Sequence, residues 1–278
     1  MEELHFVDFF WEDFTPHLLF HPVKIIDGKL THPAGENVIY DIVPGVGDLW
    51  NYSVSKERWC VGRLGEEYHP CPLKSVVKSF HQCPVCRKAV GKPPVSEVFN
   101  PDNECRDEFC DEPHVVYLAF YGEKMKVGMT PGRRLLKRAV EQGADAVGVL
   151  LNLYNRPAAR QEEKRISREF HIPEALSARD ILRALTRGLD RGVVEGRYKR
   201  ILEALGEQDR ELIFLDRYPL RKLSSTPSLW RMRKIIGEVV GIKGRYLMIN
   251  MAGPKAINLK NLLGRVLKPT SENIQLHF

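Results

Sequence analysis

The clearest pattern in the chain is a pair of alternating runs, VVYLAFY over residues 115–121 and KMKVGM over residues 124–129. They are separated by Gly122-Glu123, and a leading glycine in a two-residue turn is typical of a type II′ β-hairpin. We therefore predict a tight hairpin. If pairing is symmetrical about the turn, Tyr117 faces Gly128 across the two strands.

The predicted hairpin has two different faces because side chains alternate along a strand. The apolar face is expected to point into the core and carries Val116, Leu118, Phe120, Met125, Val127 and Met129. The other face carries Tyr117, Ala119, Tyr121, Lys124, Lys126 and Gly128. We interpret this second face as the candidate working surface, since Gly128 leaves room beside Tyr117 and Lys126 lies one diagonal step away.

Beyond the hairpin, the pattern switches to helical spacing. An apolar stripe predicts a helix from about residue 133 to 142, ended by Gly143. An apolar run over residues 146–154 predicts a third strand at the centre of a sheet. Asn155-Arg156-Pro157 then supplies an N-cap and a first-turn proline for a helix that reaches Phe170.

Two carboxylates lie beside the apolar stripe of that last helix. Taking about 100° per residue, Glu162 lies about 35° and Glu163 about 65° from the centre of the stripe. A carboxylate at the margin of a buried face needs a partner, and a divalent cation or an arginine would serve. The alternative is an ordinary ion pair within the helix, such as Glu162 with Arg165 or Arg165 with Glu169.

The remaining segments complete an α+β architecture. Residues 1–55 hold short mixed runs broken by Gly and Pro, which predicts a small β-rich N-terminal unit. A cysteine-rich zinc segment over residues 56–112 precedes the hairpin domain, which spans residues 113–176. Residues 177–278 are expected to form a basic helical region followed by a small C-terminal β-barrel-like unit.

All six cysteines lie in that second segment, at Cys60, Cys71, Cys83, Cys86, Cys105 and Cys110. In a cytoplasmic protein such clustering favours metal over disulfides. Cys83-x2-Cys86 has the spacing of half a zinc knuckle, and either the upstream or the downstream pair could complete four ligands. We predict a structural zinc that scaffolds the neighbouring domain, because a four-thiolate shell has no open position for substrate. Free buried thiols or a redox pair are the alternatives.

Charge divides the chain unequally. Residues 1–112 hold 11 Lys and Arg against 19 Asp and Glu, a net of −8, and residues 113–278 hold 31 against 17, a net of +14. Such a basic field attracts polyanions, nucleic acid above all, although a solvated surface without a partner is the alternative. No apolar run is long enough for a membrane span and the start is acidic, so we expect a cytoplasmic protein without a membrane partner.

Several strings resemble a family of domains of unknown function that joins a cysteine cluster to a GIY-YIG-like segment. They are HVVYLAFYGEKMKVGMT, KRAVEQGADA and NRPAARQEE, with GEVVGIKGRYL in the tail. The resemblance covers roughly residues 57–175 and 234–250. It implies that residues 113–176 form a GIY-YIG-like α/β domain.

GIY-YIG nucleases, as a wider superfamily, cut phosphodiesters with a hairpin tyrosine, a helical arginine and a glutamate that holds a divalent metal. The resemblance places these roles on Tyr117, Arg138 and Glu163, with Glu162 as the competing choice and Mg²⁺ or Mn²⁺ as the metal. Lys126 stands where the second tyrosine of the motif is expected. A charged lysine donates but does not accept a proton, so general-base chemistry would rest on Tyr117 alone.

We therefore expect a zinc-containing nucleic-acid-binding protein that recognises phosphate. RNA is preferred over DNA, because basic helices suit recognition of shape and backbone and no helix-turn-helix signature is present. The expected nucleic-acid contacts are Lys126, Arg133, Arg134, Arg138 and Arg160. A metal-dependent nuclease and an RNA-modifying enzyme or assembly factor are the two alternatives, and the sequence leaves the oligomeric state open.

Overall fold

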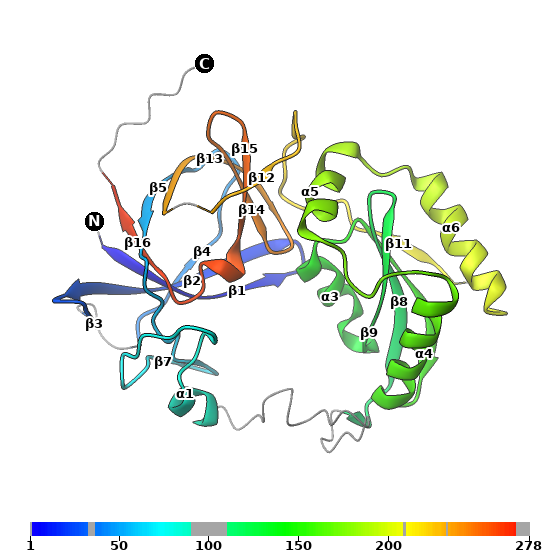
Figure 1. The fold of residues 1–278 in the computed structure, drawn as a ribbon, viewed down its shortest axis with the longest axis horizontal. Coiled ribbons are helices and arrows are strands. Elements are labelled where there is room, and N and C mark those ends of the chain that lie inside the picture. The colour runs from blue at the N-terminus through cyan, green and yellow to red at the C-terminus, as the bar shows by residue number, and fades with distance from the viewer. Residues whose placement is uncertain (1, 33–36, 90–109, 208–209, 232, 271–278) are drawn as a thin grey trace. The chain divides into compact units, whose positions relative to one another are not determined.

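The computed structural model describes residues 2–32, 37–89, 110–207, 210–231 and 233–270. The chain forms two compact units, and each is described by itself. Unit 1 comprises Met1–Lys92, Pro219–Arg221 and Pro227–Phe278, and unit 2 comprises Pro93–Tyr218 and Lys222–Thr226. Figure 1 shows that strands dominate the first unit and that helices cover strands in the second. None of the helices in the described residues is long and apolar enough to cross a membrane.

Unit 1 is built on a ten-stranded sheet whose strands come from both ends of the chain. The order is β12-β15-β14-β13-β5-β16-β1-β2-β3, and β4 pairs with β2. The strands are β1 (Glu3–Glu12), β2 (Thr15–Ile26), β3 (Lys29–Thr31), β4 (Tyr40–Ile42), β5 (Leu49–Val54), β12 (Ser228–Leu229), β13 (Lys234–Lys243), β14 (Tyr246–Asn250), β15 (Pro254–Asn258) and β16 (Val266–Pro269). A 3-10 turn, η3, spans Leu259–Asn261.

The two terminal β segments, which the sequence analysis treats as separate units, share this sheet. Strand β1 pairs antiparallel with β16, with Leu4 opposite Leu267, and β5 lies between β13 and β16. The path of paired strands runs openly from β12 to β3, so the C-terminal strands form no closed barrel in the described residues. Alternating hydrophobicity identifies a strand but does not identify its partner, because any apolar face can pack on the same core.

Unit 2 contains a four-stranded sheet in the order β11-β10-β8-β9. Its strands are β8 (His114–Tyr121), β9 (Lys124–Pro131), β10 (Ala146–Leu153) and β11 (Leu212–Phe214). Its helices are the 3-10 turn η2 (Gly132–Arg134), α3 (Leu135–Gln142), α4 (Arg156–Glu169), α5 (Ala178–Arg187) and α6 (Arg191–Ala204). Helix α3 ends where Gly143 takes a left-handed conformation with φ 77°, and the side chain of Asn155 caps α4 by accepting from the N–H of Ala158.

The predicted hairpin is confirmed in its register. Strands β8 and β9 pair antiparallel with Tyr121 opposite Lys124, Ala119 opposite Lys126 and Tyr117 opposite Gly128. In the turn, φ is positive at Gly122, at 54°, and not at the next residue, as a type II′ turn requires. The apolar face packs into the core of unit 2, which includes Val116, Leu118, Phe120, Val127, Ile166 and Tyr198.

The second face of the hairpin is more buried than a working surface would be. All eight residues of β8 are buried, because the strand lies between β9 and β10 and has cover on both faces. On the face that carries Tyr117 and Tyr121, α3 supplies this cover, and Tyr218 donates a hydrogen bond to the carbonyl of Ala144 just beyond α3. A ligand could therefore reach Tyr117 only at its hydroxyl, which lies among polar side chains.

Candidate metal centre and polar cluster

Four cysteines of unit 1 converge. The sulfur atoms of Cys60, Cys71, Cys83 and Cys86 lie within 4.8 Å of one another, and all four residues are buried. The sulfurs of Cys71 and Cys83 are 3.7 Å apart. The backbone N–H of Cys83 donates to the sulfur of Cys60 at 3.1 Å, as expected around thiolates that bind a metal. These four residues are close enough to hold a metal ion.

The upstream pair completes the group. Cys60 and Cys71 flank a short hairpin of β6 (Arg63–Leu64) and β7 (Tyr68–His69), which turns the chain back so that both sulfurs face the same point. Cys110 lies outside the group, and Cys105 lies outside the described residues. Of the two arrangements that the spacing allows, the structure brings together the one that uses Cys60 and Cys71.

Gly62 makes this approach possible. Its φ is +73°, and a Cβ at this position would lie 2.3 Å from the carbonyl oxygen of His69. Only glycine fits such a close contact between two backbone segments. The strand after Cys60 can therefore lie directly against the strand before Cys71.

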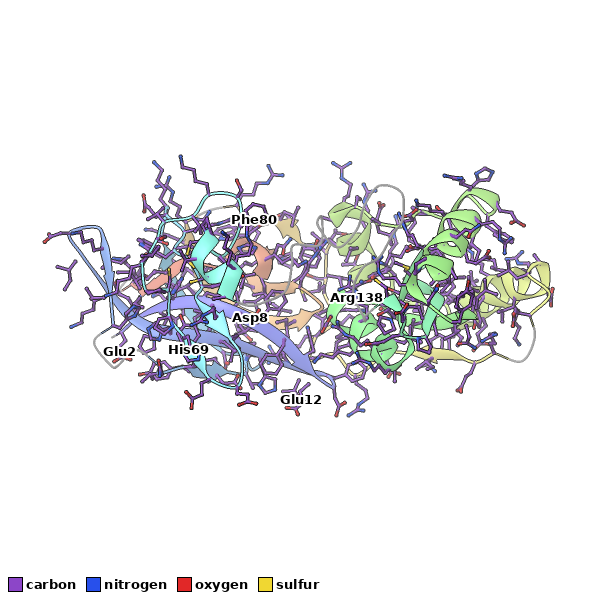
Figure 2. All side chains as sticks on the ribbon, turned by 90° about the horizontal axis from the view of Figure 1, so that it is seen from below. Glu2, Asp8, Glu12, His69, Phe80 and Arg138 are labelled. Carbon is purple, nitrogen blue, oxygen red and sulfur yellow. The ribbon has the colours of Figure 1, made fainter. Side chains whose placement is uncertain are left out.

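The second pair of cysteines lies at the start of a short helix, α1 (Pro84–Ala89). The N–H of Cys86 points to the sulfur of Cys83 at 3.5 Å. The loop that leads to Cys83 carries the exposed Phe80, and the guanidinium of Arg87 lies 4.6 Å from its ring centroid (Figure 2). This cation–π contact joins α1 to the loop that precedes it.

The thiol pKa values fit a site for a cation. Burial opposes ionisation of Cys83, but the N–H of Cys86 and the neighbouring thiols donate to its sulfur, and together they lower its pKa to about 7. Burial raises the pKa of Cys60 to about 11, and the nearby Cys71 adds to this shift. Several thiolates at this spacing repel one another, so a bound divalent cation would let all four ionise.

A polar cluster in unit 2 is centred on Tyr117. Gly128 lies opposite, and a Cβ there would be 2.8 Å from the Cζ and the hydroxyl oxygen of Tyr117. The tyrosine ring therefore occupies the space that a side chain on β9 would fill. This contact explains the glycine as a packing requirement of the ring rather than as a flexible point.

Helix α3 supplies two partners for the Tyr117 hydroxyl. The side chains of Arg138 and Gln142, one turn apart, both interact with it electrostatically, and Arg138 is otherwise exposed (Figure 2). Burial raises the pKa of Tyr117 above its ordinary value of 10, although Arg138 acts in the opposite direction. The phenol is thus neutral near pH 7 and can donate a hydrogen bond.

Helix α4 brings a buried carboxylate to the same place. The side chain of Glu163 is 8% exposed, and Nη1 of Arg160 lies 2.5 Å from its Oε2 and 2.6 Å from Oε2 of Glu174. Burial and the nearby Glu174 raise the pKa of Glu163, whereas Arg160 and Lys126 lower it. Glu163 also acts on the pKa of Tyr117. We call Tyr117, Lys126, Arg138 and Glu163 the Tyr117 cluster.

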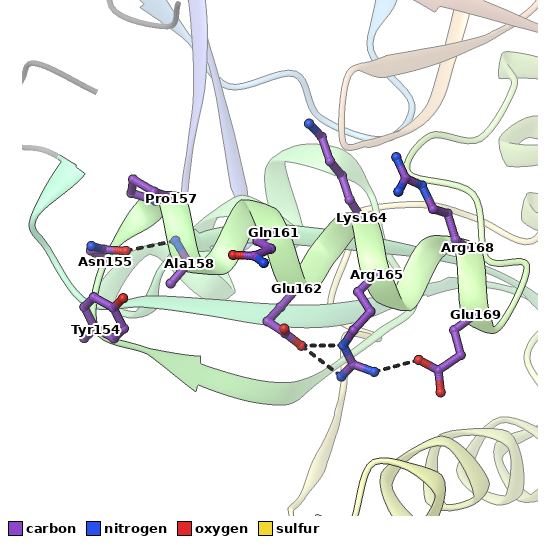
Figure 3. A pocket seen from close by; sticks show the side chains of 10 residues that line it. All are labelled: Tyr154, Asn155, Pro157, Ala158, Gln161, Glu162, Lys164, Arg165, Arg168 and Glu169. Atoms are coloured by element: carbon purple, nitrogen blue, oxygen red, sulfur yellow. Dashed lines mark hydrogen bonds and ion pairs between the residues drawn. The ribbon is translucent and has the colours of Figure 1, made fainter. Parts of the chain in front are cut away.

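Glu162 points elsewhere. It forms an ion pair with Arg165 at 2.8 Å, and Arg165 reaches Glu169 at 2.6 Å on the outer side of α4 (Figure 3). This is the intrahelical network that the sequence offered as the alternative role for Glu162. Glu163 is the glutamate that faces Tyr117.

The two arginines before α3 are already paired. Arg133 binds Glu112 at 2.9 Å, and Arg134 lies 3.9 Å from Glu141. Their guanidiniums lie at the surface, so these pairs are weak and exchangeable. The structure does not place either of them in the Tyr117 cluster.

Three members of this neighbourhood were missed by the sequence analysis. Gln142 lies four residues after Arg138, so helical spacing alone would have put it on the same face. Arg156 is seven residues before Glu163 on α4, so helical spacing also places it on the same face, near that carboxylate. Glu174 follows the helix in an irregular segment, and no sequence pattern indicates that it shares Arg160 with Glu163.

Comparison with family models identifies a family for this chain. Residues 51–267, more than half of the chain, match the model of a family described as Protein of unknown function (DUF2797). The matched span includes the four converging cysteines and all of the Tyr117 cluster. No curated protein and no solved structure matches the chain. The chain therefore belongs to the DUF2797 family.

Proposed function

We propose that this chain is a zinc-containing nucleic-acid-binding protein and that its Tyr117 cluster binds a phosphate of the polynucleotide, with RNA as the preferred polymer. The observation that carries the proposal is that Tyr117 lies among charged side chains in unit 2, because Arg138 and Glu163 both act on the pKa of Tyr117 and Lys126 acts on the pKa of Glu163. It agrees with the resemblance to GIY-YIG domains, which assigns a phosphodiester to this position.

The charges at the cluster suit a phosphate. Lys126 is partly exposed and acts on Glu163, and Arg138 is exposed and presents a cation beside the buried Tyr117. Glu163 is the one carboxylate of the cluster, and Arg160 already neutralises it. A phosphate that approaches would therefore meet net positive charge and N–H donors.

Tyr117 is best suited to a positioning role. It is 1% exposed, so a polymer would contact it only through its hydroxyl, which interacts electrostatically with the guanidinium of Arg138. Its pKa is raised, so a neutral phenol would donate to a phosphate oxygen and would be a poor general base at neutral pH. The geometry thus supports binding more directly than catalysis.

Zinc is the metal proposed for the four cysteines. Four thiolates without a carboxylate or water position are the ligand set of structural zinc. Such a closed site would fix the β6–β7 hairpin against α1, since the segment has few other apolar residues to pack. Its role would be to hold the fold of unit 1.

A metal-dependent nuclease is the second candidate, and the orientation of Glu163 favours it. The glutamate acts on Tyr117, as Arg138 does, and the resemblance gives this glutamate the role of a metal ligand. A divalent cation at Glu163 would have to displace Arg160, which could keep its second partner, Glu174. Lys126 would then supply charge to the transition state.

Binding is tested by fluorescence anisotropy of the full, zinc-loaded chain with labelled RNA and DNA, single-stranded and duplex, of equal length. We expect tighter binding to RNA, and a loss of affinity with rising salt. Lys126→Gln and Arg138→Gln should each weaken binding and reduce the slope of log K against log salt by about one. Arg191→Gln is the matched control, because Arg191 pairs with Asp216 and belongs to neither site.

The same samples with Mg²⁺ or Mn²⁺ separate the two candidates. Metal-dependent cleavage that disappears in Glu163→Gln supports the nuclease, and intact substrate after prolonged incubation supports binding alone. Absence of saturable binding to every polymer, or equal losses in the control variant, would contradict the proposal.

A further inference from the structure

The outer side of α4 carries a groove that neither the cluster nor the family match explains. It has a volume of about 780 Å³ and is lined by Tyr154, by the N-cap Asn155 and by side chains of α4 from Pro157 to Glu169 (Figure 3). We call this the α4 groove and define it by Tyr154, Lys164 and Arg168. It lies in unit 2, on the same helix that supplies Glu163.

Two cations in the α4 groove have no partner among the described residues. Lys164 and Arg168 make no hydrogen bond or ion pair there, whereas Arg165 is held between two glutamates. Lys164 and Arg168 are four residues apart, so they lie about 40° apart around the helix and about 6 Å apart along it. Figure 3 shows both side chains extending to the same side of α4, away from the paired network. They form a short cationic row.

An exposed aromatic ring lies at the other end of the groove. Tyr154 is 75% exposed, the largest exposed fraction among the large hydrophobic side chains of the described residues. It follows directly after β10 and precedes the helix cap Asn155, so both neighbours fix its backbone. A large aromatic ring held open to solvent by a rigid strand end is suited to stacking on another flat group.

The groove adjoins the Tyr117 cluster around α4. Lys164 follows Glu163 in sequence and lies about 100° around the helix from it, and Arg160 lies between the two directions. A strand with one phosphate at the cluster could therefore continue over Arg160 onto Lys164 and Arg168. Cations at the spacing of one helical turn can each meet a backbone phosphate.

We propose that the α4 groove binds an unpaired, single-stranded segment of the nucleic acid, with a base stacked on Tyr154 and backbone phosphates at Lys164 and Arg168. This inference rests on the proposed function, because it supplies the path of the same polymer beyond the Tyr117 cluster. A duplex would not fit this arrangement, since its bases stack on each other and leave no face for Tyr154.

The test uses the full chain and two probes of matched phosphate number, a fluorescein-labelled oligouridylate and a labelled RNA hairpin whose loop is replaced by a non-nucleotide linker, so that it offers no unpaired base. Tyr154→Ala should weaken oligouridylate binding roughly five- to hundredfold, the range for loss of one stacked base, whereas Tyr154→Phe should retain it. The double variant Lys164→Gln/Arg168→Gln should lower the salt slope for the oligouridylate by about 1.4, because each phosphate contact on a single strand contributes about 0.7. Hairpin binding should change little in Tyr154→Ala.

The outcomes separate the two proposals. If Lys126→Gln weakens binding but Tyr154→Ala and the double variant match the unchanged chain, the groove is not the path and the proposed function stands. If Tyr154→Ala weakens binding of the hairpin and of the oligouridylate equally, the assignment of the groove to a single-stranded segment is also overturned. If the unchanged chain binds neither probe, both proposals fail. Far-ultraviolet circular dichroism of each variant establishes that α4 remains folded.

Discussion

The contact between Gly128 and Tyr117 gives the sharpest test of the structure of unit 2. Gly128→Ala adds one methyl group, which would lie 2.8 Å from Cζ and from the hydroxyl oxygen of Tyr117 and 3.2 Å from its Cε1. Carbon atoms prefer separations of about 3.5–4.0 Å, so the ring must move by roughly 0.7 Å or more. The ring is buried and packed between β9 and α3, so it has little freedom to move.

The expected cost follows from overpacking. An added methyl group in a close-packed core destabilises by about 1–3 kcal/mol, and the close approach of 2.8 Å to a buried ring places this case toward the upper end. With an m-value of about 1–3 kcal/mol per molar urea, the unfolding midpoint of unit 2 should fall by roughly 1 M. Gly132→Ala is the matched control, because its new methyl group would lie 3.6 Å from Val115, an ordinary contact distance.

The chain provides separate signals for its two units. All four tryptophans, Trp11, Trp50, Trp59 and Trp230, belong to unit 1, and helices α3 to α6 belong to unit 2. In a urea titration, the circular dichroism signal of the helices at 222 nm, where the peptide group absorbs, should therefore show the shift caused by Gly128→Ala. Tryptophan fluorescence should not show this shift. A midpoint equal to that of Gly132→Ala would refute the packing of Tyr117 against β9.

Three further predictions use the same signals. Removal of the metal by a chelator, or Cys83→Ser, should release about one zinc per chain and shift the tryptophan transition, because Trp59 precedes Cys60. Burial, with help from His21, lowers the pKa of His5 to about 3. Neutral His5 thus contributes to the stability of unit 1 at pH values above its ordinary pKa of 6.5, and this contribution is lost as pH falls toward 3. In His5→Leu the stability of unit 1 should fall less steeply over this pH range. Burial raises the pKa of Glu163 above 4.5, so protonated Glu163 contributes its full stability to unit 2 below pH 4.5 and this contribution is lost as pH rises. Unit 2 of Glu163→Gln should therefore become more stable relative to the unchanged chain between pH 4.5 and 7.

Each of these has a clear contrary result. Metal content well below one per chain in native protein, or a chelator that shifts only the helical signal, would contradict the cysteine site. A parallel acid dependence in His5→Leu and the unchanged chain would show that other groups govern acid unfolding. A constant stability difference for Glu163→Gln across the pH range would mean that Arg160 fully compensates the buried charge.

The local elements around the hairpin were predictable because their signals are local. Alternation about Gly122 determined the pairing of Tyr117 with Gly128, and the confirmed register follows from the turn alone. The helix end at Gly143 and the cap at Asn155 likewise depend on backbone conformations that particular residues favour. Such features need no knowledge of distant contacts.

The candidate sites were only partly predictable. The spacing of Cys83 and Cys86 identified half of a metal centre, but the choice of Cys60 and Cys71 depends on how the β6–β7 hairpin folds back. The sequence left Glu162 and Glu163 as competing choices. The structure separates them because Arg165 holds one on the outer side of α4 while the other faces Tyr117.

By itself, the sequence determined the hairpin, the helix end at Gly143, the helix cap at Asn155 and the residue types that can bind metal or phosphate. Only the tertiary structure decided that both ends of the chain share one sheet, that the Tyr117 face is buried under α3, and that Arg160 joins Glu163 to Glu174. The physical reason is the range of the interactions. Periodicity and turn conformation act over a few residues, whereas strand partners, burial and ion pairs depend on which distant segments compete for the same apolar and charged surfaces.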